Sequence, residues 1–171
     1  MQDTLLNGRK FRTFNAIDDF NREVLAIDID TSLPAARVVR TLTQIVELRG
    51  KPSKIRMDNG PEFISNKFEL WCKENEIELQ YTQPGKPMQN GRVERFNGTY
   101  RRDILDAYLF EDLWQVRALT EEFVEEYNNQ RPHEALNDMT PREYLLKCGQ
   151  LSCPQSTLEL TTVQQVNIKL L

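Results

Sequence analysis

The sequence predicts an α/β fold in which a mixed β-sheet is flanked by helices. Two observations support this prediction. Short runs rich in β-branched and aromatic residues alternate along the chain with longer segments of helical periodicity, and the first two of these runs flank a tight polar turn. Strands that alternate with helices are typical of sandwiches in which helices cover a mixed sheet.

The composition fits one soluble globular domain. The chain has 171 residues, of which 39% are hydrophobic and 28% are charged, so it can bury a substantial core. Its net charge of −4 argues against a protein whose whole surface binds nucleic acid, but it allows a local basic groove. Because we find neither an apolar run of membrane-spanning length nor a signal-peptide core, we expect no membrane association and a cytoplasmic location.

The N-terminal third predicts a hairpin followed by a helix. Residues 10–18 and 23–30 are strand-like and lie on either side of the polar stretch 19–22, which is the pattern of a β-hairpin. Ser32 is the predicted N-cap of the helix, and Gly50 is expected to end it.

The next segment predicts two strands with a helix between them. Residues 53–57 and 77–81 are strand-like, and Pro61 is expected to open the helix. Trp71 lies on the apolar face of that helix and is a predicted core residue. Glycine and proline keep residues 83–87 out of regular structure.

The C-terminal half predicts three helices and a tail. A long helix covers about residues 89–108, and a second covers about 112–129, with Trp114 in the core and a row of glutamates facing solvent. Residues 140–144 cap a short final helix. We therefore expect one domain over residues 1–148 and a tail over 149–171 that is β-like or disordered.

The cysteines and the single histidine do not predict a metal site. Cys72, Cys148 and Cys153 are odd in number and scattered, so they form no disulfide framework. A structural zinc site normally needs four such ligands, and His133 is the only histidine. We expect reduced thiols and a His133 that packs in a loop.

Asp58 is the first candidate for chemistry. It follows the predicted strand 53–57 directly and precedes the turn Asn59-Gly60. A carboxylate just past the carboxyl end of a buried strand lies where α/β sheets usually hold ligands. From spacing alone, a simple turn or cap residue is the favoured interpretation.

Glu94 is the second candidate. It shares a helix face with Asn90, Asn97 and Arg101, which recur at i, i+4, i+7 and i+11. Five basic residues surround it, giving a local charge of +4 over residues 83–102, which suits a phosphate backbone. The candidate DNA-binding residues are Lys86, Asn90, Arg92, Arg95, Arg101 and Arg102. The alternative is that the arginines are solvated or pair with the glutamates of the 112–129 helix, especially Glu121, Glu122 and Glu125.

Several long motifs occur in a fixed order and carry a resemblance. They are IDDFNRE (17–23), MDNGPEF (57–63), TQPGKPMQNGRVERFNGTYR (82–101) and YNNQRPHEALNDMTPREY (127–144). Over about residues 5–148 the sequence resembles the integrase core of bacterial insertion-sequence transposases, the branch closest to retroviral integrases. The 35 residues between Asp58 and Glu94 match the spacing that names the family's D,D-35-E triad.

This resemblance implies a ribonuclease H-like fold and DNA transposition as the function. In the family, three carboxylates hold two Mg²⁺ ions, with Mn²⁺ as a substitute, for strand cleavage and strand transfer on DNA ends. Asp58 matches the second Asp and Glu94 the Glu, so both are the expected catalytic and metal residues. The implied partners are element-end and target DNA, further copies of the chain, or intact transposase subunits in a bacterial cytoplasm.

The sequence departs from the family at the first carboxylate. In relatives the first Asp lies about nine residues before the glycine matched by Gly8, a position that would precede Met1. Asp3 aligns with a non-catalytic acid, and Asp18 and Asp19 lie at the end of the second strand. We therefore expect the central first strand to be missing or incomplete, the two-metal site to need the missing Asp, and the chain to be inactive alone.

Two other functions fit the same sequence. One is a non-enzymatic remnant that binds DNA or an intact transposase subunit and modulates it. The other is a generic nuclease on the same fold, which the full-length match to integrase motifs disfavours. Neither the element ends, the target preference nor the oligomeric state follows from the sequence.

Overall fold

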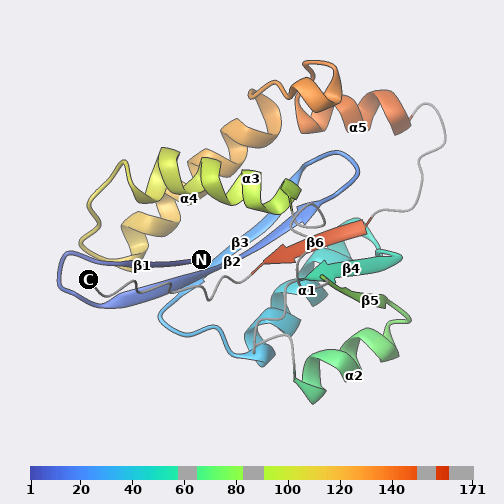
Figure 1. The fold of residues 1–171 in the computed structure, drawn as a ribbon, viewed down its shortest axis with the longest axis horizontal. Helices are drawn as coiled ribbons and strands as arrows, with labels where there is room; N and C mark the ends of the chain where they lie inside the picture. Colours follow the sequence, from blue (N-terminus) through green and yellow to red (C-terminus); the bar gives the residue numbers. More distant parts are fainter. Residues whose placement is uncertain (58–64, 83–90, 150–156, 162–171) are drawn as a thin grey trace.

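The structure is a computed structural model that describes residues 1–57, 65–82, 91–149 and 157–161. A mixed sheet lies between two layers of helices (Figure 1). The strands are β1 (Gln2–Thr4), β2 (Lys10–Asp18), β3 (Val24–Asp30), β4 (Lys54–Met57), β5 (Glu78–Tyr81) and β6 (Thr157–Thr161). The α-helices are α1 (Ala35–Arg49), α2 (Asn66–Glu74), α3 (Gly91–Tyr100), α4 (Leu113–Asn129) and α5 (Pro141–Gly149). The π-helical turn η2 (Arg101–Leu105) and the 3₁₀ turn η3 (Glu134–Leu136) complete the described elements.

The sheet is organised around β2. Along one edge β2 pairs with β3, and along the other it pairs first with β1 and then with β6, always antiparallel. β6 is in turn parallel to β4, and β4 is parallel to β5. The C-terminal strand β6 therefore occupies the central position of the sheet, between β2 and β4 (Figure 1).

Each face of the sheet has its own apolar core. Phe11 and Ile17 of β2 pack with residues of α3, η2 and α4, where Phe96 and Phe123 lie 6.1 Å apart between ring centroids. Phe14 alternates to the other face and packs with α1, β4 and α2. This alternation is what a strand buried on both faces requires. The predicted α/β arrangement of a mixed sheet between helices is confirmed.

The N-terminal predictions are confirmed with one correction. β2 and β3 form the predicted hairpin, and Gly50 ends α1 with a φ of 87°, a conformation that favours glycine. The predicted N-cap Ser32 is wrong. α1 begins at Ala35 with Pro34 as its N-cap residue and no side-chain cap, because the fixed φ of Pro34 and the restriction it places on Leu33 keep the preceding residues extended.

The predicted helix of residues 89–108 is shorter at its C-terminal end. α3 widens into the π-helical turn at Arg101, and the Asp106 N–H closes that turn on the Arg101 carbonyl oxygen at 2.8 Å. The chain then leaves the helix, and Phe110 packs edge-on against Phe11. The helical periodicity of the sequence extended the prediction to residue 108. The packing of Phe110 into the core stabilises the earlier end of the helix.

Capping signals place the other helices. Ser65 accepts a hydrogen bond from the Phe68 N–H at the start of α2, while Pro61, the expected start of that helix, lies outside the described residues. Asp112 caps α4, which covers Leu113–Asn129 and so agrees with the predicted helix of about residues 112–129. Thr140 and Glu143 form a reciprocal capping box at α5.

The two tryptophans differ in burial. Trp71 packs against the α1–α2 core, and its indole N–H donates to Thr43 Oγ1 at 3.1 Å. Trp114 is 76% exposed, so its prediction as a core residue is wrong. It sits in the first turn of α4, where Leu113 and Val116 take the inward positions. No described helix combines the length and apolar character needed to cross a membrane.

Candidate functional site

Three contacts fix helix α3 along the middle of the sheet. At its first turn Arg92 pairs with Asp19 in the β2–β3 turn. In its middle the Asn15 side-chain amide donates to Asn97 Oδ1 at 2.7 Å. Just past its end, Arg101 donates to the Gln2 carbonyl oxygen of β1 at 2.9 Å. The helix therefore runs antiparallel to β2, over the edge that carries β6 and β1.

Glu94 lies between the first two of these contacts. Arg92 and Asn97 bracket the β2 stretch from Asn15 to Asp18, which is the stretch that pairs with β6. α3 also packs directly against β6. Glu94 itself is exposed and forms no ion pair with any described residue. The structure thus places the part of α3 that carries Glu94 over the central strands of the sheet.

A buried polar pair lies one helical turn from Glu94. Asn15 is fully buried and Asn97 nearly so, and their hydrogen bond crosses from sheet to helix. Asn15 Oδ1 and the neighbouring Thr13 Oγ1 are buried without a hydrogen-bond partner among the described residues. Burying an oxygen without a hydrogen-bond partner costs free energy. A further polar group that donates a hydrogen bond to these oxygens would therefore stabilise this part of the molecule.

The other half of the expected site lies outside the described residues. Asp58, Lys86 and Asn90 all belong to that part of the chain, and their predicted roles stay predictions. β4 ends at Met57, whose backbone partner in β6 is Leu160. Because Leu160 pairs with Ala16 of β2, the strand that leads to Asp58 ends beside the region covered by α3.

Most of the predicted DNA-binding arginines have carboxylate partners. Arg101 lies 3.3 Å from both Asp3 and Asp106, and Arg102 lies 2.9 Å from Asp103. Together with the Arg92 pair, these contacts involve β1, the β2–β3 turn and η2 rather than the glutamates of α4. Arg95 is exposed and pairs with no described carboxylate.

Asp18 and Asp19 lie side by side and have different environments. Burial raises the pKa of Asp18, although its carboxylate accepts a hydrogen bond from the Phe20 N–H. The Asp19 carboxylate forms ion pairs with three arginines, which are Arg22 at 2.8 Å, Arg56 at 3.8 Å and Arg92 in close contact. Asp19 therefore joins the hairpin to the helix that carries Glu94.

The sequence did not predict Asn15 and Asp19 as part of this region. The available signal for Asn15 is weak, since it alternates with Phe11, Thr13 and Ile17 on one face of a strand and has no local partner. Asp19 looked like an ordinary turn residue. Both gain their role from contacts across more than 70 positions of sequence.

His133 and Cys72 are packing residues. The imidazole of His133 contacts the ring of Tyr127 edge-on, at 4.8 Å between centroids, and burial followed by the charge of Arg131 lowers its pKa. Burial raises the pKa of the Cys72 thiol to about 12, so the thiol is protonated at neutral pH. His133 thus packs in a loop, as expected.

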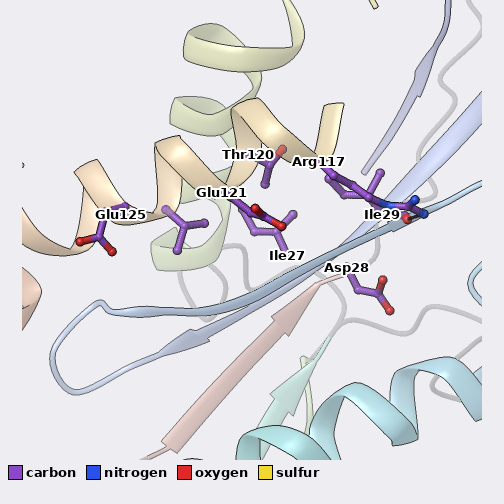
Figure 2. A pocket seen from close by; sticks show the side chains of 8 residues that line it. Ile27, Asp28, Ile29, Arg117, Thr120, Glu121 and Glu125 are labelled. Carbon is purple, nitrogen blue, oxygen red and sulfur yellow. Dashed lines mark hydrogen bonds between the residues drawn. The ribbon is translucent and has the colours of Figure 1, made fainter. Parts of the chain in front are cut away.

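A cavity of about 310 Å³ lies between β3 and α4 (Figure 2). Ile27, Ile29 and Val124 supply apolar lining, and Arg117 and Glu121 supply charge. Among the predicted site residues that the structure describes, none lines this cavity.

Two family models match the chain, and both are described as integrase core domain. One matches residues 3–87 and the other residues 75–141. Between them they include β2, β4 and α3. The C-terminal strand β6 lies outside both matches.

Proteins of bacterial insertion elements are similar to this chain in sequence. A 31.7 kDa protein of insertion element IS407 from Burkholderia multivorans is 37% identical over 147 residues, which cover 86% of this chain and 53% of that protein. The putative transposase InsK of insertion sequence element IS150 from Escherichia coli is 25% identical over 142 residues, covering 81% and 50%. The chain thus spans about half the length of these relatives.

A retroviral integrase core has a fold similar to that of this chain. The magnesium complex of the HTLV-2 integrase catalytic core, in its trimeric form, superposes with a TM-score of 0.66 at 20% identity, covering 84% of this chain and 90% of that one. This similarity supports the ribonuclease H-like fold expected from the motifs. With the two family models and the insertion-element relatives, it shows that the chain belongs to the integrase core family shared by insertion-sequence transposases and retroviral integrases.

Proposed function

We propose that this chain is the catalytic core of a DNA transposition protein and that its site forms around Asp58 and Glu94. The observation that carries the proposal is the position of Glu94, an exposed carboxylate held over the central strands by α3. The spacing of 35 residues from Asp58 and the match to integrase core models support the same assignment. The proposed substrates are the DNA ends of an element and its target.

The donor chemistry of this region fits a hard divalent cation. Glu94 offers carboxylate oxygens without a competing ion pair among the described residues, and Asp58 would add a second carboxylate. Oxygen ligands of this kind suit Mg²⁺ and Mn²⁺. Such ions, when bound, supply a nucleophile activated at neutral pH and stabilise the leaving oxygen during phosphoryl transfer. The protein's own contribution is to hold Glu94 on a rigid helix and to present arginines to the DNA backbone.

The oligomeric form belongs to the same proposal. The HTLV-2 integrase core is described in a trimeric form, and we propose that this core also acts with further copies of itself. The alternative function is a non-enzymatic protein that binds DNA or an intact transposase subunit. The two proposals differ in whether Glu94 binds a metal.

Metal binding by the full chain is the test. We expect Mn²⁺, measured by electron paramagnetic resonance, to bind at millimolar concentration and Glu94→Gln to weaken binding by roughly tenfold or more, because ligand charge largely sets affinity for a hard cation. Glu111→Gln removes an exposed carboxylate beyond the end of η2 and is the matched control. Equal binding by Glu94→Gln and the control would favour the non-enzymatic alternative.

We expect residues 1–171 alone not to nick DNA in Mg²⁺. The reason is that two carboxylates hold two metal ions poorly when the third ligand implied by the family is not supplied. A gel assay on supercoiled and end-containing DNA checks this. Mg²⁺-dependent nicking that is lost in Asp58→Asn would contradict it and would show that these residues suffice.

A further inference from the structure

β6 and β1 form one interrupted strand along the same edge of β2. Gln2 pairs with Arg12, and Met1 exchanges both backbone hydrogen bonds with Thr13, at 2.6 and 2.8 Å. Thr161 pairs with Asn15, and the β6 ladder continues to Asp18. Both strands are antiparallel to β2, so β6 points toward Met1. A single β2 residue, Phe14, separates the two ladders.

The strand that occupies this central position, β6, lies outside the residues that the family models match. Together the two family models match residues 3–141, whereas β6 covers Thr157–Thr161. Both of its neighbours, β2 and β4, lie inside the match. Without β6, no described strand would pair with the open edges of β2 and β4 over this stretch, and exposed strand edges readily take up another strand.

Two features of this position describe the kind of strand it accepts. Ile55 and Met57 of β4, together with Ala16 of β2, are buried in the α1–α2 core, so alternate positions of the incoming strand face an apolar cluster. On the other face, Thr13 Oγ1 and Asn15 Oδ1 are buried without a partner among the described residues. The position therefore suits an extended segment that is apolar on one face and carries a hydrogen-bond donor on the other.

We propose that the gap between β2 and β4 is a strand-acceptor site that β6 fills in cis, and that the β6 sequence takes the same place when it is grafted directly ahead of Met1. The two occupants compete, because each would pair with the same residues of β2 and β4. Binding by strand addition supplies affinity through the main chain and selectivity through alternate side chains. The proposal rests on strand register and does not depend on the DNA or metal chemistry of Glu94.

Moving the strand tests the register. Three variants end at Gly149. The first carries no addition, the second carries TLELT followed by one serine ahead of Met1, and the third carries TLELT followed by two serines in the same place. We expect truncation to lower the melting temperature by about 10 °C or more, and the one-serine variant to recover most of that loss. The two-serine variant should not recover it, because a one-residue slip turns every side chain to the other face. Unchanged stability on truncation, or equal recovery with either link, would overturn the proposal.

Competition is tested in the full chain, so the result does not depend on the truncated variant folding. TLELT and one serine are placed ahead of Met1 of residues 1–171, and amide hydrogen exchange of residues 157–161 is measured. We expect protection of these amides to fall by about tenfold or more, with a two-serine link as the matched control. Protection that stays at the level of the unmodified chain with the one-serine link would show that β6 is a fixed part of the fold.

Discussion

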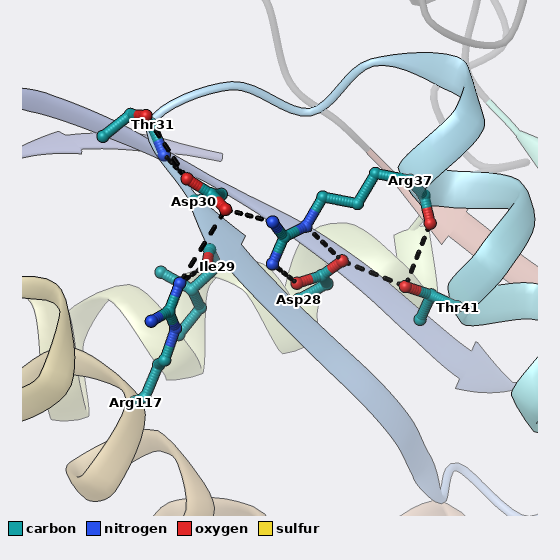
Figure 3. Close-up of polar contacts among 7 residues, drawn as sticks. All are labelled: Asp28, Ile29, Asp30, Thr31, Arg37, Thr41 and Arg117. Carbon is teal, nitrogen blue, oxygen red and sulfur yellow. Dashed lines mark hydrogen bonds and ion pairs between the residues drawn. The ribbon is translucent and has the colours of Figure 1, made fainter.

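Asp28 is the centre of a charged cluster that ties β3 to α1. Arg37 donates two hydrogen bonds to it, at 2.7 and 2.8 Å, and Thr41 donates a third at 3.0 Å (Figure 3). Arg37 also pairs with Asp30, which lies 3.9 Å from Arg117 of α4. The cluster therefore connects the edge strand to helices on both faces of the sheet.

Asp28→Asn should destabilise the protein in a pH-dependent way. Burial alone would raise the pKa of Asp28, but the hydrogen bonds from Arg37 and Thr41 outweigh it and lower the pKa. A lowered folded pKa contributes stability that is present above the ordinary value and is lost as pH falls through the lowered one. We expect a loss of about 1–3 kcal/mol at pH 7, shrinking below about pH 4.

Urea unfolding at pH 7 and at about pH 3 measures this effect. Glu47→Gln, an exposed carboxylate on the same helix α1, is the control and should change little at either pH. An Asp28→Asn loss of equal size at both pH values would contradict the ionic origin of the effect.

At this scale the sequence predicted residues better than it predicted their contacts. Asp58 and Glu94 were predicted as site residues from their motifs and spacing, and their roles stay predictions. Asn15 and Asp19, which hold α3 in place, were not, because a side chain that pairs with a partner more than 70 positions away leaves no local signal. The arginines near Glu94 were predicted as a basic surface, and only the structure shows the aspartates beside three of them.

Two glycines in different elements should respond to alanine with opposite signs. Gly98 lies on the exposed face of α3, and Gly50 ends α1 at a φ of 87°. An added Cβ would meet no atom within 4 Å at either position, so backbone conformation decides the outcome. Gly98→Ala should stabilise by about 0.5–1 kcal/mol because alanine favours the helix. Gly50→Ala should destabilise by about 1–2 kcal/mol because L-residues avoid positive φ.

Chemical denaturation of the two variants beside the parent chain checks both signs in one experiment. Each variant serves as the control for the other, since both add the same methyl group to an open position. Destabilisation by Gly98→Ala would mean that α3 needs flexibility at this point or that Gly98 contacts residues outside the described part.

The elements were predictable where their signals are local. The hairpin, the stop at Gly50 and the capping box at Thr140 all depend on neighbouring residues and are confirmed. The end of α3 and the exposure of Trp114 depend on which apolar residues the core accepts. The placement of β6 depends on backbone pairing with strands about 100 and 140 residues earlier, which periodicity does not encode.

The charge of the whole molecule is unevenly distributed. The net charge is −4, and exposed glutamates of α4 account for much of the acidic surface. Arginines of α3 and η2 form ion pairs with neighbouring aspartates, as Arg92 does with Asp19 and Arg102 with Asp103. A molecule of this kind has no general attraction for DNA, so any binding must come from the local basic surface and must weaken as salt rises.

Arg95→Ala with Arg102→Ala should therefore reduce DNA binding and its salt dependence. Both residues are exposed, and arginines at such a surface contact phosphates and set affinity rather than sequence choice. We expect the slope of log K against log salt to fall by ~1–2 units, about equally on unrelated duplexes. Arg117→Ala removes one charge from α4, on the side of β3 and Asp30, and should leave the slope nearly unchanged. Binding measured from about 50 to 200 mM salt decides the matter. An unchanged slope in the double variant, or an equal fall in Arg117→Ala, would mean that Arg95 and Arg102 do not bind DNA.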